Sequence, residues 1–223
     1  GIDVKSYRFT DVGDVKAIRE FIQVNKDFHI LGGGSNILLT RDLKKPVLKI
    51  STKGISVLDE HSNEHFVFVQ VQAGENWHDF VTFCVLFGFG GLVNLSLIPG
   101  NVGSCPLQNI GAYGVEVKDS FHSLEAIDIK TGELRVYNRE ECKFGYRDSI
   151  FKNELKDQCI ITHVTFRLSR NHRVKTHYPD LEKELDKYPE TTIQYIRKAI
   201  IAIRQKKLPD PEVLGNAGSF FKN

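Results

Sequence analysis

Two glycine-rich segments carry the residue types that could hold a phosphorylated cofactor. The first, Gly32-Gly33-Gly34-Ser35-Asn36, follows an apolar stretch that is expected to be a strand. Consecutive glycines allow successive backbone N–H groups to converge on one point, and such concavities bind phosphate. Position 37 is Ile and more apolar residues follow, so the third glycine and the helix of a Rossmann motif are both lacking. Spacing alone leaves a plain tight turn as the alternative to a phosphate site.

The second segment, residues 97–114, contains four glycines and no regular hydrophobic periodicity. Ser104, Gln108 and Asn109 add neutral hydrogen-bonding side chains to it. A long loop inside a compact domain is usually functional or disordered, and this one is too apolar to be disordered. Its composition fits a loop that wraps around a planar ligand with many hydrogen-bond acceptors. The alternative is an irregular loop packed on the core.

Four other side chains have the chemistry of a site but also simpler structural explanations. Ser219 lies in a turn of small residues but lacks the GxSxG context of a hydrolase nucleophile. Arg147 lies beside an aromatic residue and Asp148, and a surface ion pair is the simpler interpretation. Tyr178 precedes a turn that leads into a helix, where packing is the usual role. Lys207 ends the last predicted helix, where a lysine stabilises the helix dipole.

A mixture of helix and strand signals surrounds these residues. Helix caps and apolar residues at helical spacing predict helices at 14–25, 76–87, 181–188 and 192–205. Strands are predicted at 28–31, 37–39, 47–50, 66–71, 123–129, 133–137 and 160–168, with a hairpin turn at 130–132. The pattern indicates an α+β chain of two packed subdomains that meet near residues 51–65.

Composition excludes several classes of protein. The chain of 223 residues is 41% hydrophobic and 26% charged, as in ordinary globular proteins, and contains no methionine even at position 1, so we interpret it as an internal fragment. Its net charge of +2 comes from scattered basic residues and gives no case for nucleic-acid binding. No apolar run reaches the ~18 residues of a membrane span. Cysteines without a CxxC pair and histidines without partner ligands indicate a cytoplasmic protein without disulfides or a metal.

Six segments, in order along the chain, resemble the UDP-N-acetylenolpyruvoylglucosamine reductases, the flavoenzymes that complete UDP-N-acetylmuramate in bacterial cell-wall synthesis. These segments are residues 30–38, 73–78, 98–116, 144–152, 207–211 and 215–223. The resemblance implies an α+β FAD-binding domain of the vanillyl-alcohol-oxidase (PCMH) type, with subdomains at 1–54 and 55–210. Residues 211–223 would begin a third, substrate-binding domain. The activity implied is reduction of UDP-N-acetylglucosamine enolpyruvate by NADPH, with non-covalently bound FAD, in a monomer.

The resemblance also implies roles for single residues. Ser219 would be the proton donor and Arg147 the active-site arginine. Tyr178, Lys207 and Asn223 would hold the substrate, with Tyr178 on a mobile loop that one subclass of the family has. The residues expected to bind FAD are Gly32, Gly33, Gly34, Ser35, Asn36, Pro99, Ser104, Gln108, Gly111, Tyr113, Ile161 and Arg204. The family's catalytic glutamate would lie beyond residue 223, so the chain alone is expected to bind flavin rather than to turn over.

Two other functions stay open at this point. One is a different flavin oxidase with the same FAD domain, acting on an alcohol or a phenol. Ser219 and Lys207 have no obvious role in such an enzyme. The other is a flavin-binding or nucleotide-sugar-binding module without turnover.

Overall fold

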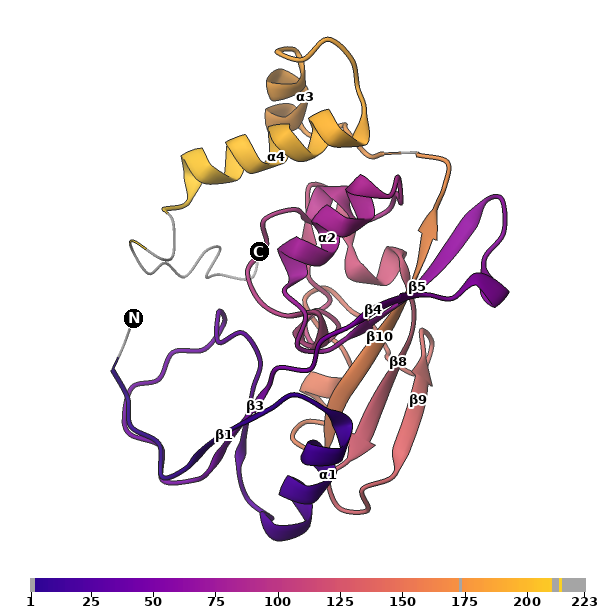
Figure 1. Cartoon of the computed structure of the whole chain (residues 1–223). Coiled ribbons are helices and arrows are strands. Elements are labelled where there is room, and N and C mark those ends of the chain that lie inside the picture. Colours follow the sequence, from indigo (N-terminus) through magenta and orange to yellow (C-terminus); the bar gives the residue numbers. More distant parts are fainter. Residues whose placement is uncertain (1–2, 173, 210–212, 214–223) are drawn as a thin grey trace.

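The computed structural model describes residues 3–172, 174–209 and 213, which form two larger sheets and one two-stranded sheet, with helices at opposite ends of the molecule (Figure 1). The first sheet is small and entirely parallel. Its strands, in spatial order, are β1 (Phe9–Val12), β3 (Val47–Ile50) and β2 (His29–Leu31). Strands β1 and β2 run parallel on either side of β3, and the helix between them in sequence provides the crossover that parallel strands need.

That helix, α1 (Val15–Val24), forms where the sequence predicts it. The carboxylate of Asp14 accepts a hydrogen bond from the backbone N–H of Ala17 at 2.8 Å, so Asp14 caps the helix. One face buries Ile18, Phe21 and Ile22. Burial of this apolar face is what holds a ten-residue helix, because a helix of that length is marginal by itself.

The second sheet is antiparallel and forms the centre of the molecule. Its strands, in spatial order, are β4 (Ile55–Val57), β5 (Phe66–Gln72), β10 (Cys159–Ser169), β8 (Phe121–Asp128) and β9 (Leu134–Asn138). Strand β5 alternates buried and partly buried residues, so one of its faces packs on the core. Strands β8 and β9 pair as the predicted hairpin.

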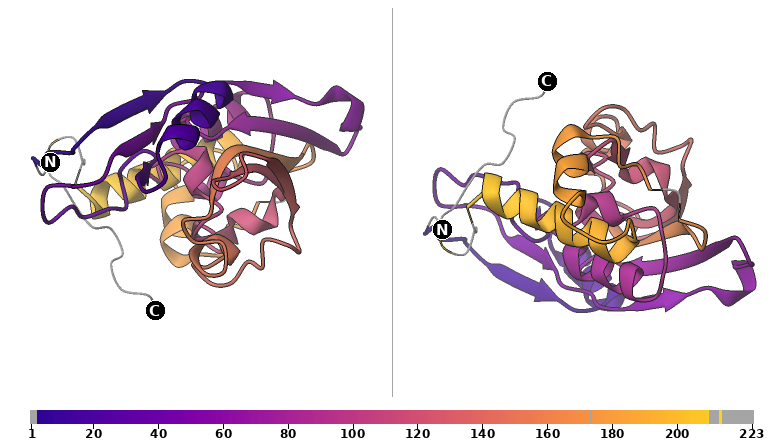
Figure 2. Two further views of the ribbon diagram at one scale, coloured as in Figure 1. Left: turned by 90° about the horizontal axis from the view of Figure 1, so that it is seen from below. Right: turned by 90° about the horizontal axis from the view of Figure 1, so that it is seen from above.

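Three further helices lie at the end of the molecule opposite α1 (Figure 1). They are α2 (Trp77–Leu86), α3 (Pro179–Leu185) and α4 (Ile193–Lys207). The helix α1 therefore lies toward the viewer in the left view of Figure 2, and α4 does so in the right view. Ile196, Ile200 and Ile203 of α4 form a second, smaller core with Val85 of α2 and Leu181 of α3. This core fixes α4 over α2, so residues from both helices can reach the loops beneath them.

The connection between α2 and β8 is irregular, as the sequence predicts for residues 97–114. It contains the short antiparallel pair β6 (Gly111–Ala112) and β7 (Val115–Glu116). Short 3₁₀ helices complete the chain: η1 (Asp59–His61), η2 (Val93–Leu95), η3 (Val102–Ser104), η4 (Val117–Asp119) and η5 (Ile150–Lys152).

Three local predictions are wrong. Residues 37–39 do not form a strand, and Ile37 and Leu38 are 51% and 71% exposed, because the chain leaves the sheet at the glycines and finds no neighbouring strand. Strands β1 and β4 are missed, since both are short and weakly alternating. The third helix begins at Pro179 rather than residue 181, because proline suits the first turn, and it ends at Leu185 rather than 188.

The four cysteines are buried or half-buried and form no disulfide among the described residues. Cys84, Cys105, Cys142 and Cys159 are all free thiols, and burial raises the pKa of each, to about 12 for Cys142 and about 11 for Cys159.

No helix among residues 3–172 and 174–209 is long and apolar enough to cross a bilayer. Within the same residues, no group of three His, Cys, Asp or Glu side chains could hold a metal ion.

The two sheets share one hydrophobic core. Leu48 and Ile50 of the first sheet belong to the same buried cluster as Val69 and Val71 of the second. The chain passes between the sheets at residues 51–54, just before β4. The predicted boundaries at 54/55 and 210/211 remain predictions, and all but one of residues 211–223 lie outside the described part of the chain.

Candidate functional site

The two glycine-rich segments lie against each other. A Cβ atom added to Gly33 would lie 2.9 Å from Oδ1 of Asn101 and 3.1 Å from Cα of Gly100, so only glycine allows this approach. The side-chain amide of Asn36 donates a hydrogen bond to Oε1 of Gln108 at 2.8 Å, across 72 residues of sequence. The fold therefore joins two segments that the sequence analysis assigned separately to one cofactor.

Gly100 is the centre of this junction. Its backbone is in the left-handed region, with φ of 115°, and a Cβ there would lie 3.0 Å from Oγ of Ser35 and 3.4 Å from Oγ of Ser104. The two serine hydroxyls thus face the same point from opposite segments. Pro99 immediately precedes this glycine and belongs to the same loop.

The first segment presents unused hydrogen-bond donors. Among the described residues, none accepts a hydrogen bond from the backbone N–H groups of residues 33–36. These residues are exposed and follow directly from the end of β2. Successive free N–H groups in a glycine turn form the kind of concavity that binds a phosphate. A solvated surface turn also presents exposed N–H groups, so the pyrophosphate site stays a prediction at this point.

The second segment is held by the turn that precedes α2. The N–H groups of Val102 and Gly103 donate to the carbonyls of Glu75 and Ala73, both at 2.8 Å. Ala73 in turn donates to the carbonyl of Thr162 in β10 at 2.8 Å. The loop is therefore fixed, through two sets of backbone hydrogen bonds, to the central strand of the large sheet.

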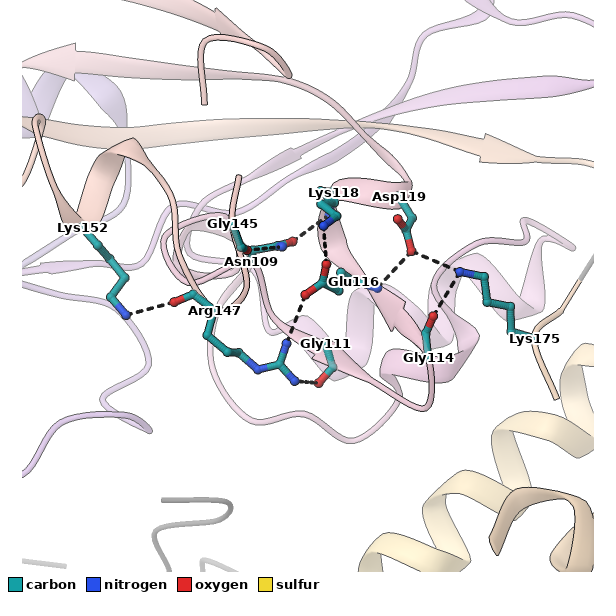
Figure 3. Close-up of polar contacts among 10 residues, drawn as sticks. All are labelled: Asn109, Gly111, Gly114, Glu116, Lys118, Asp119, Gly145, Arg147, Lys152 and Lys175. Carbon is teal, nitrogen blue, oxygen red and sulfur yellow. Dashed lines mark hydrogen bonds and ion pairs between the residues drawn. The ribbon is translucent and has the colours of Figure 1, made fainter. Parts of the chain in front are cut away.

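Arg147 lies beside the β6–β7 hairpin (Figure 3). Its Nη2 donates to the carbonyl of Gly111 at 2.7 Å, and its Nη1 lies 3.5 Å from Oε1 of Glu116. The guanidinium also lies over the ring of Tyr146, 4.9 Å from its centroid. The backbone of Arg147 is left-handed, with φ of 54°, which is costly for a residue with a side chain. Such strain persists only where the surroundings hold the residue in place.

Asn109 helps to fix the backbone of the loop that carries Arg147. Its side chain is fully buried, donates to the carbonyl of Gly145 at 2.8 Å, and accepts from the N–H of Lys118 at 3.1 Å (Figure 3). Ser149 adds a hydrogen bond from its hydroxyl to the carbonyl of Leu107 at 2.7 Å. The loop that carries Arg147 is therefore tied to the second glycine-rich segment on both sides of Arg147.

Tyr113, two residues after Gly111, extends the site toward α3 and α4. Its ring meets the ring of Tyr178 edge-on, with centroids 5.3 Å apart. Burial raises the pKa of Tyr113, while the positive charges of Arg204 and Lys207 act in the opposite direction. The predicted flavin residue Tyr113 and the predicted substrate residue Tyr178 are thus in contact.

Two cations from α4 lie around these rings. Nε of Arg204 donates to the carbonyl of Leu97 at 3.2 Å, and burial lowers the pKa of this guanidinium. Lys207 forms an ion pair with Asp180, in the first turn of α3, which raises the pKa of the lysine. Both cations therefore lie close to the loops that carry the predicted site.

One predicted residue, Ile161, is not joined to this group by its own side chain. Ile161 is 8% exposed in β10, next to a register shift with β8, and its neighbour Thr162 binds Ala73 behind the loop. Ser219 and Asn223 lie outside the described residues.

Several supporting residues were missed from the sequence. Glu116 pairs with Arg147, and Asp180 pairs with Lys207. Asn94, almost fully buried, donates to the carbonyls of Tyr113 and Lys175 at 3.0 and 2.7 Å. Each is an ordinary polar residue in the sequence, and only its long-range partner reveals its role.

Comparisons with known proteins identify the family and the fold. Residues 7–138 match the model of an FAD binding domain family. Over its whole length the chain is 52% identical to the UDP-N-acetylenolpyruvoylglucosamine reductase of Flavobacterium johnsoniae and 47% identical to that of Pseudomonas savastanoi pv. phaseolicola, and it spans 67% of each protein.

A solved structure shows the same fold. The UDP-N-acetylenolpyruvylglucosamine reductase of Thermus caldophilus superposes on 96% of this chain, and on 67% of its own, with a TM-score of 0.67. The sequence identity in that superposition is 24%, so the likeness is one of fold.

Proposed function

The chain belongs to the UDP-N-acetylenolpyruvoylglucosamine reductase family, whose members are FAD-dependent oxidoreductases, and we propose that it reduces UDP-N-acetylglucosamine enolpyruvate to UDP-N-acetylmuramate with NADPH. The observation that carries this proposal is the identity of 52% across the whole chain. Because UDP-N-acetylmuramate is a precursor of peptidoglycan, the proposed role is in cell-wall synthesis in the cytoplasm.

The residues of the two glycine-rich segments fit FAD. The free N–H groups of residues 33–36 would hold the pyrophosphate, and the close approach at Gly33 leaves no room for a side chain there. Ser104, Gln108 and Tyr113 would line the flavin, with Gly111 beside them. When bound, FAD would accept a hydride from NADPH and deliver it to the enolpyruvyl double bond.

Arg147 would bind the carboxylate of the enolpyruvyl group. Negative charge develops next to this carboxylate during reduction, and a fixed cation lowers the energy of that state. A guanidinium suits this task because it stays protonated and offers donors in a rigid plane. The contacts with Gly111 and Glu116 hold the guanidinium before the substrate arrives, so no energy is spent on orienting it.

The proton that completes the reduction would come from Ser219. A hydroxyl is acidic enough for a basic carbanion, and it carries no charge that would repel the substrate carboxylate.

The diphosphate of the substrate would be held by Tyr178 and Lys207. Lys207 already has an anionic partner in Asp180, so a diphosphate would take over a contact that the carboxylate makes in its absence. Tyr178 is 44% exposed and rests against Tyr113, which leaves its hydroxyl accessible to a ligand beside the flavin.

The identity to reductases across the whole chain favours this function over that of an alcohol or phenol oxidase with the same FAD domain.

A direct test is to incubate the full-length protein with FAD, NADPH and UDP-N-acetylglucosamine enolpyruvate and to analyse the product by mass spectrometry. A product heavier than the substrate by two hydrogens, formed only with NADPH present, supports the proposal. Unchanged substrate, with FAD bound to the protein, counts against it.

A further inference from the structure

Leu97, at the start of the second glycine-rich segment, has an unusual backbone. Its φ of 57° lies in the left-handed region, which a branched apolar side chain adopts only at a cost. Leu97 precedes Pro99 and Gly100, so its conformation sets the direction in which the loop runs toward the first segment. Because residue 97 is leucine and not glycine, contacts from other residues must stabilise this backbone conformation.

Two side chains hold Leu97 from opposite sides. Its backbone N–H donates to Nδ1 of His78 at 2.9 Å, and its carbonyl accepts from Nε of Arg204 at 3.2 Å. His78 belongs to the first turn of α2 and Arg204 to the last turn of α4. The strained peptide is thus clamped between the two helices that the smaller core holds together.

The same turn of α2 holds the loop at two more points. The backbone N–H of Trp77 donates to the carbonyl of Gly100 at 2.9 Å, and its indole N–H donates to the carbonyl of Leu95 at 2.9 Å. Leu95, Leu97 and Gly100 are therefore hydrogen-bonded to the consecutive helix residues Trp77 and His78. This accounts for the Trp-His pair in the segment 73–78, which the proposed function does not otherwise use.

The hydrogen bond from Leu97 fixes the protonation of His78. Because Nδ1 accepts this bond, it carries no proton, and the neutral ring must carry its proton on Nε2. Nε2 lies 3.2 Å from Nη2 of Arg197, but both groups are donors in this tautomer and form no hydrogen bond with each other, so Nη2 donates to Oγ1 of Thr82 at 2.8 Å instead. A second proton on the ring could only go to Nδ1, where it would point at the N–H of Leu97. Protonation and the clamp therefore exclude each other.

The charges around His78 also favour the neutral ring. Burial lowers the pKa of His78, Arg197 and Arg204 on α4 lower it further, and Asp79 on α2 opposes them. Residues 95–100 of the loop contribute no charged side chain. With its pKa below the usual value near 6.5, the ring is neutral at neutral pH and becomes protonated only in acid.

We propose that His78 is a positioning residue for the FAD site, which holds the loop 97–104 in its binding conformation only while its imidazole is neutral. This inference rests on the proposed placement of the flavin beside Ser104 and Gln108. It predicts that the affinity for FAD falls when the pH falls through the range in which His78 becomes protonated.

Two substitutions separate the hydrogen bond from the titration. His78→Leu removes the acceptor and leaves the half-buried N–H of Leu97 without its partner, which should weaken FAD binding about tenfold or more at every pH. His78→Asn places an amide oxygen where Nδ1 was, so it should keep tight binding and lose the pH dependence. Thr82→Val is the control for changes around the ring, because it removes the hydroxyl that donates to the backbone carbonyl of His78 and accepts from Arg197, but keeps the imidazole itself.

The experiment measures the dissociation constant of FAD by flavin fluorescence, from about pH 8 to about pH 5, for the full-length protein and the three variants. Wild type and Thr82→Val should lose affinity together in acid, while His78→Asn stays level. Equal affinity for wild type and His78→Leu overturns the proposal, and so does the same acid loss in His78→Asn.

Hydrogen exchange of the Leu97 amide gives a second readout that needs no cofactor. Its protection should fall about tenfold or more in His78→Leu and be retained in His78→Asn. A wild-type protein that binds no FAD would count against the proposed function instead, and the exchange of Leu97 would still decide whether His78 holds the loop. Unchanged protection in His78→Leu would overturn the proposal.

Discussion

Arg147 donates a hydrogen bond from its guanidinium to the carbonyl of Gly111 at 2.7 Å, across 36 residues of sequence. The bond joins a loop after the β8–β9 hairpin to the hairpin that also carries Tyr113. A Cβ at Gly111 would lie 2.6 Å from Nη1 of Arg147 and 3.0 Å from the carbonyl of Val115, so a side chain there would displace the guanidinium from its present position. The cation is thus built into the same surface as the predicted flavin contacts.

Replacing Arg147 by lysine should damage the reaction although the charge is kept. A lysine ammonium cannot keep the planar contacts with Gly111 and Glu116 while also binding a carboxylate. We expect kcat to fall by about 10²-fold or more, the usual loss for one donor that stabilises developing charge. Steady-state kinetics with saturating NADPH measures this loss.

The matched control is Arg135→Lys, the same substitution at an exposed ion pair with Glu141. It should leave kcat within a factor of about two, because surface pairs contribute little. Equal kinetics for Arg147→Lys and the wild type would remove Arg147 from the proposed site.

Gly33→Ala tests the junction between the two glycine-rich segments. The new Cβ would lie 2.9 Å from Oδ1 of Asn101 and 3.1 Å from Cα of Gly100, so the backbone must shift. We expect the dissociation constant of FAD to rise between about fivefold and 150-fold, since such overpacking costs about 1–3 kcal/mol. Fluorescence titration of FAD into the apoprotein gives the constant.

Gly13→Ala is the control for this change, because a Cβ at Gly13 meets nothing within 4 Å. Its affinity for FAD should equal that of the wild type. If Gly33→Ala also binds FAD as the wild type does, the junction does not form part of the cofactor site.

Much of the regular structure could be predicted from local patterns. The helix capped by Asp14 and the β8–β9 hairpin follow from neighbouring residues alone, and both are confirmed. The parallel pairing of β1 with β3 could not be predicted, because a partner 38 residues away supplies the hydrogen bonds. The apolar run at 37–39 misled for the same reason, since periodicity does not reveal whether a partner strand exists.

The candidate site also has features that the sequence predicts and features that it does not. The α+β class, the FAD-binding fold and the enzyme class are confirmed by the family comparisons. Glycine runs and neutral polar side chains gave the signal for the two segments, but not for the contact between Asn36 and Gln108. The roles of His78, Glu116 and Asp180 depend on partners that are distant in sequence, and a sequence pattern carries no sign of them. The roles of the site residues remain predictions.

Lys207→Ala should weaken substrate binding. Loss of a charged donor to a diphosphate removes about 1.5–3 kcal/mol, so we expect the KM for UDP-N-acetylglucosamine enolpyruvate to rise about tenfold or more. The KM for NADPH should change little, because Lys207 is assigned to the other substrate. Initial rates at varied concentrations of each substrate separate the two effects.

Lys206 offers the matched control, since it is the adjacent lysine and pairs with Glu184 at 3.1 Å instead. Lys206→Ala should leave both KM values unchanged. A similar rise in both variants would mean that the overall charge of the α4 end, and not a contact of Lys207, attracts the substrate.

Leu48→Ala and Leu38→Ala test the fold, including the strand that does not form. Leu48 is fully buried in the core that the two sheets share, so its truncation should lower the free energy of unfolding by about 2–5 kcal/mol. Leu38 is 71% exposed, and its truncation should change stability by less than about 0.5 kcal/mol. Urea denaturation followed by circular dichroism measures both. A large loss in Leu38→Ala would show that residues 37–39 are buried after all.

The most direct test of the central claim is the visible absorption spectrum of the full-length protein, recorded without oxygen. We expect an oxidised flavin spectrum that bleaches when NADPH is added. The colour should return only after the addition of UDP-N-acetylglucosamine enolpyruvate. A protein that stays colourless in the presence of FAD, or a bleached flavin that this substrate does not reoxidise, would contradict the proposed function.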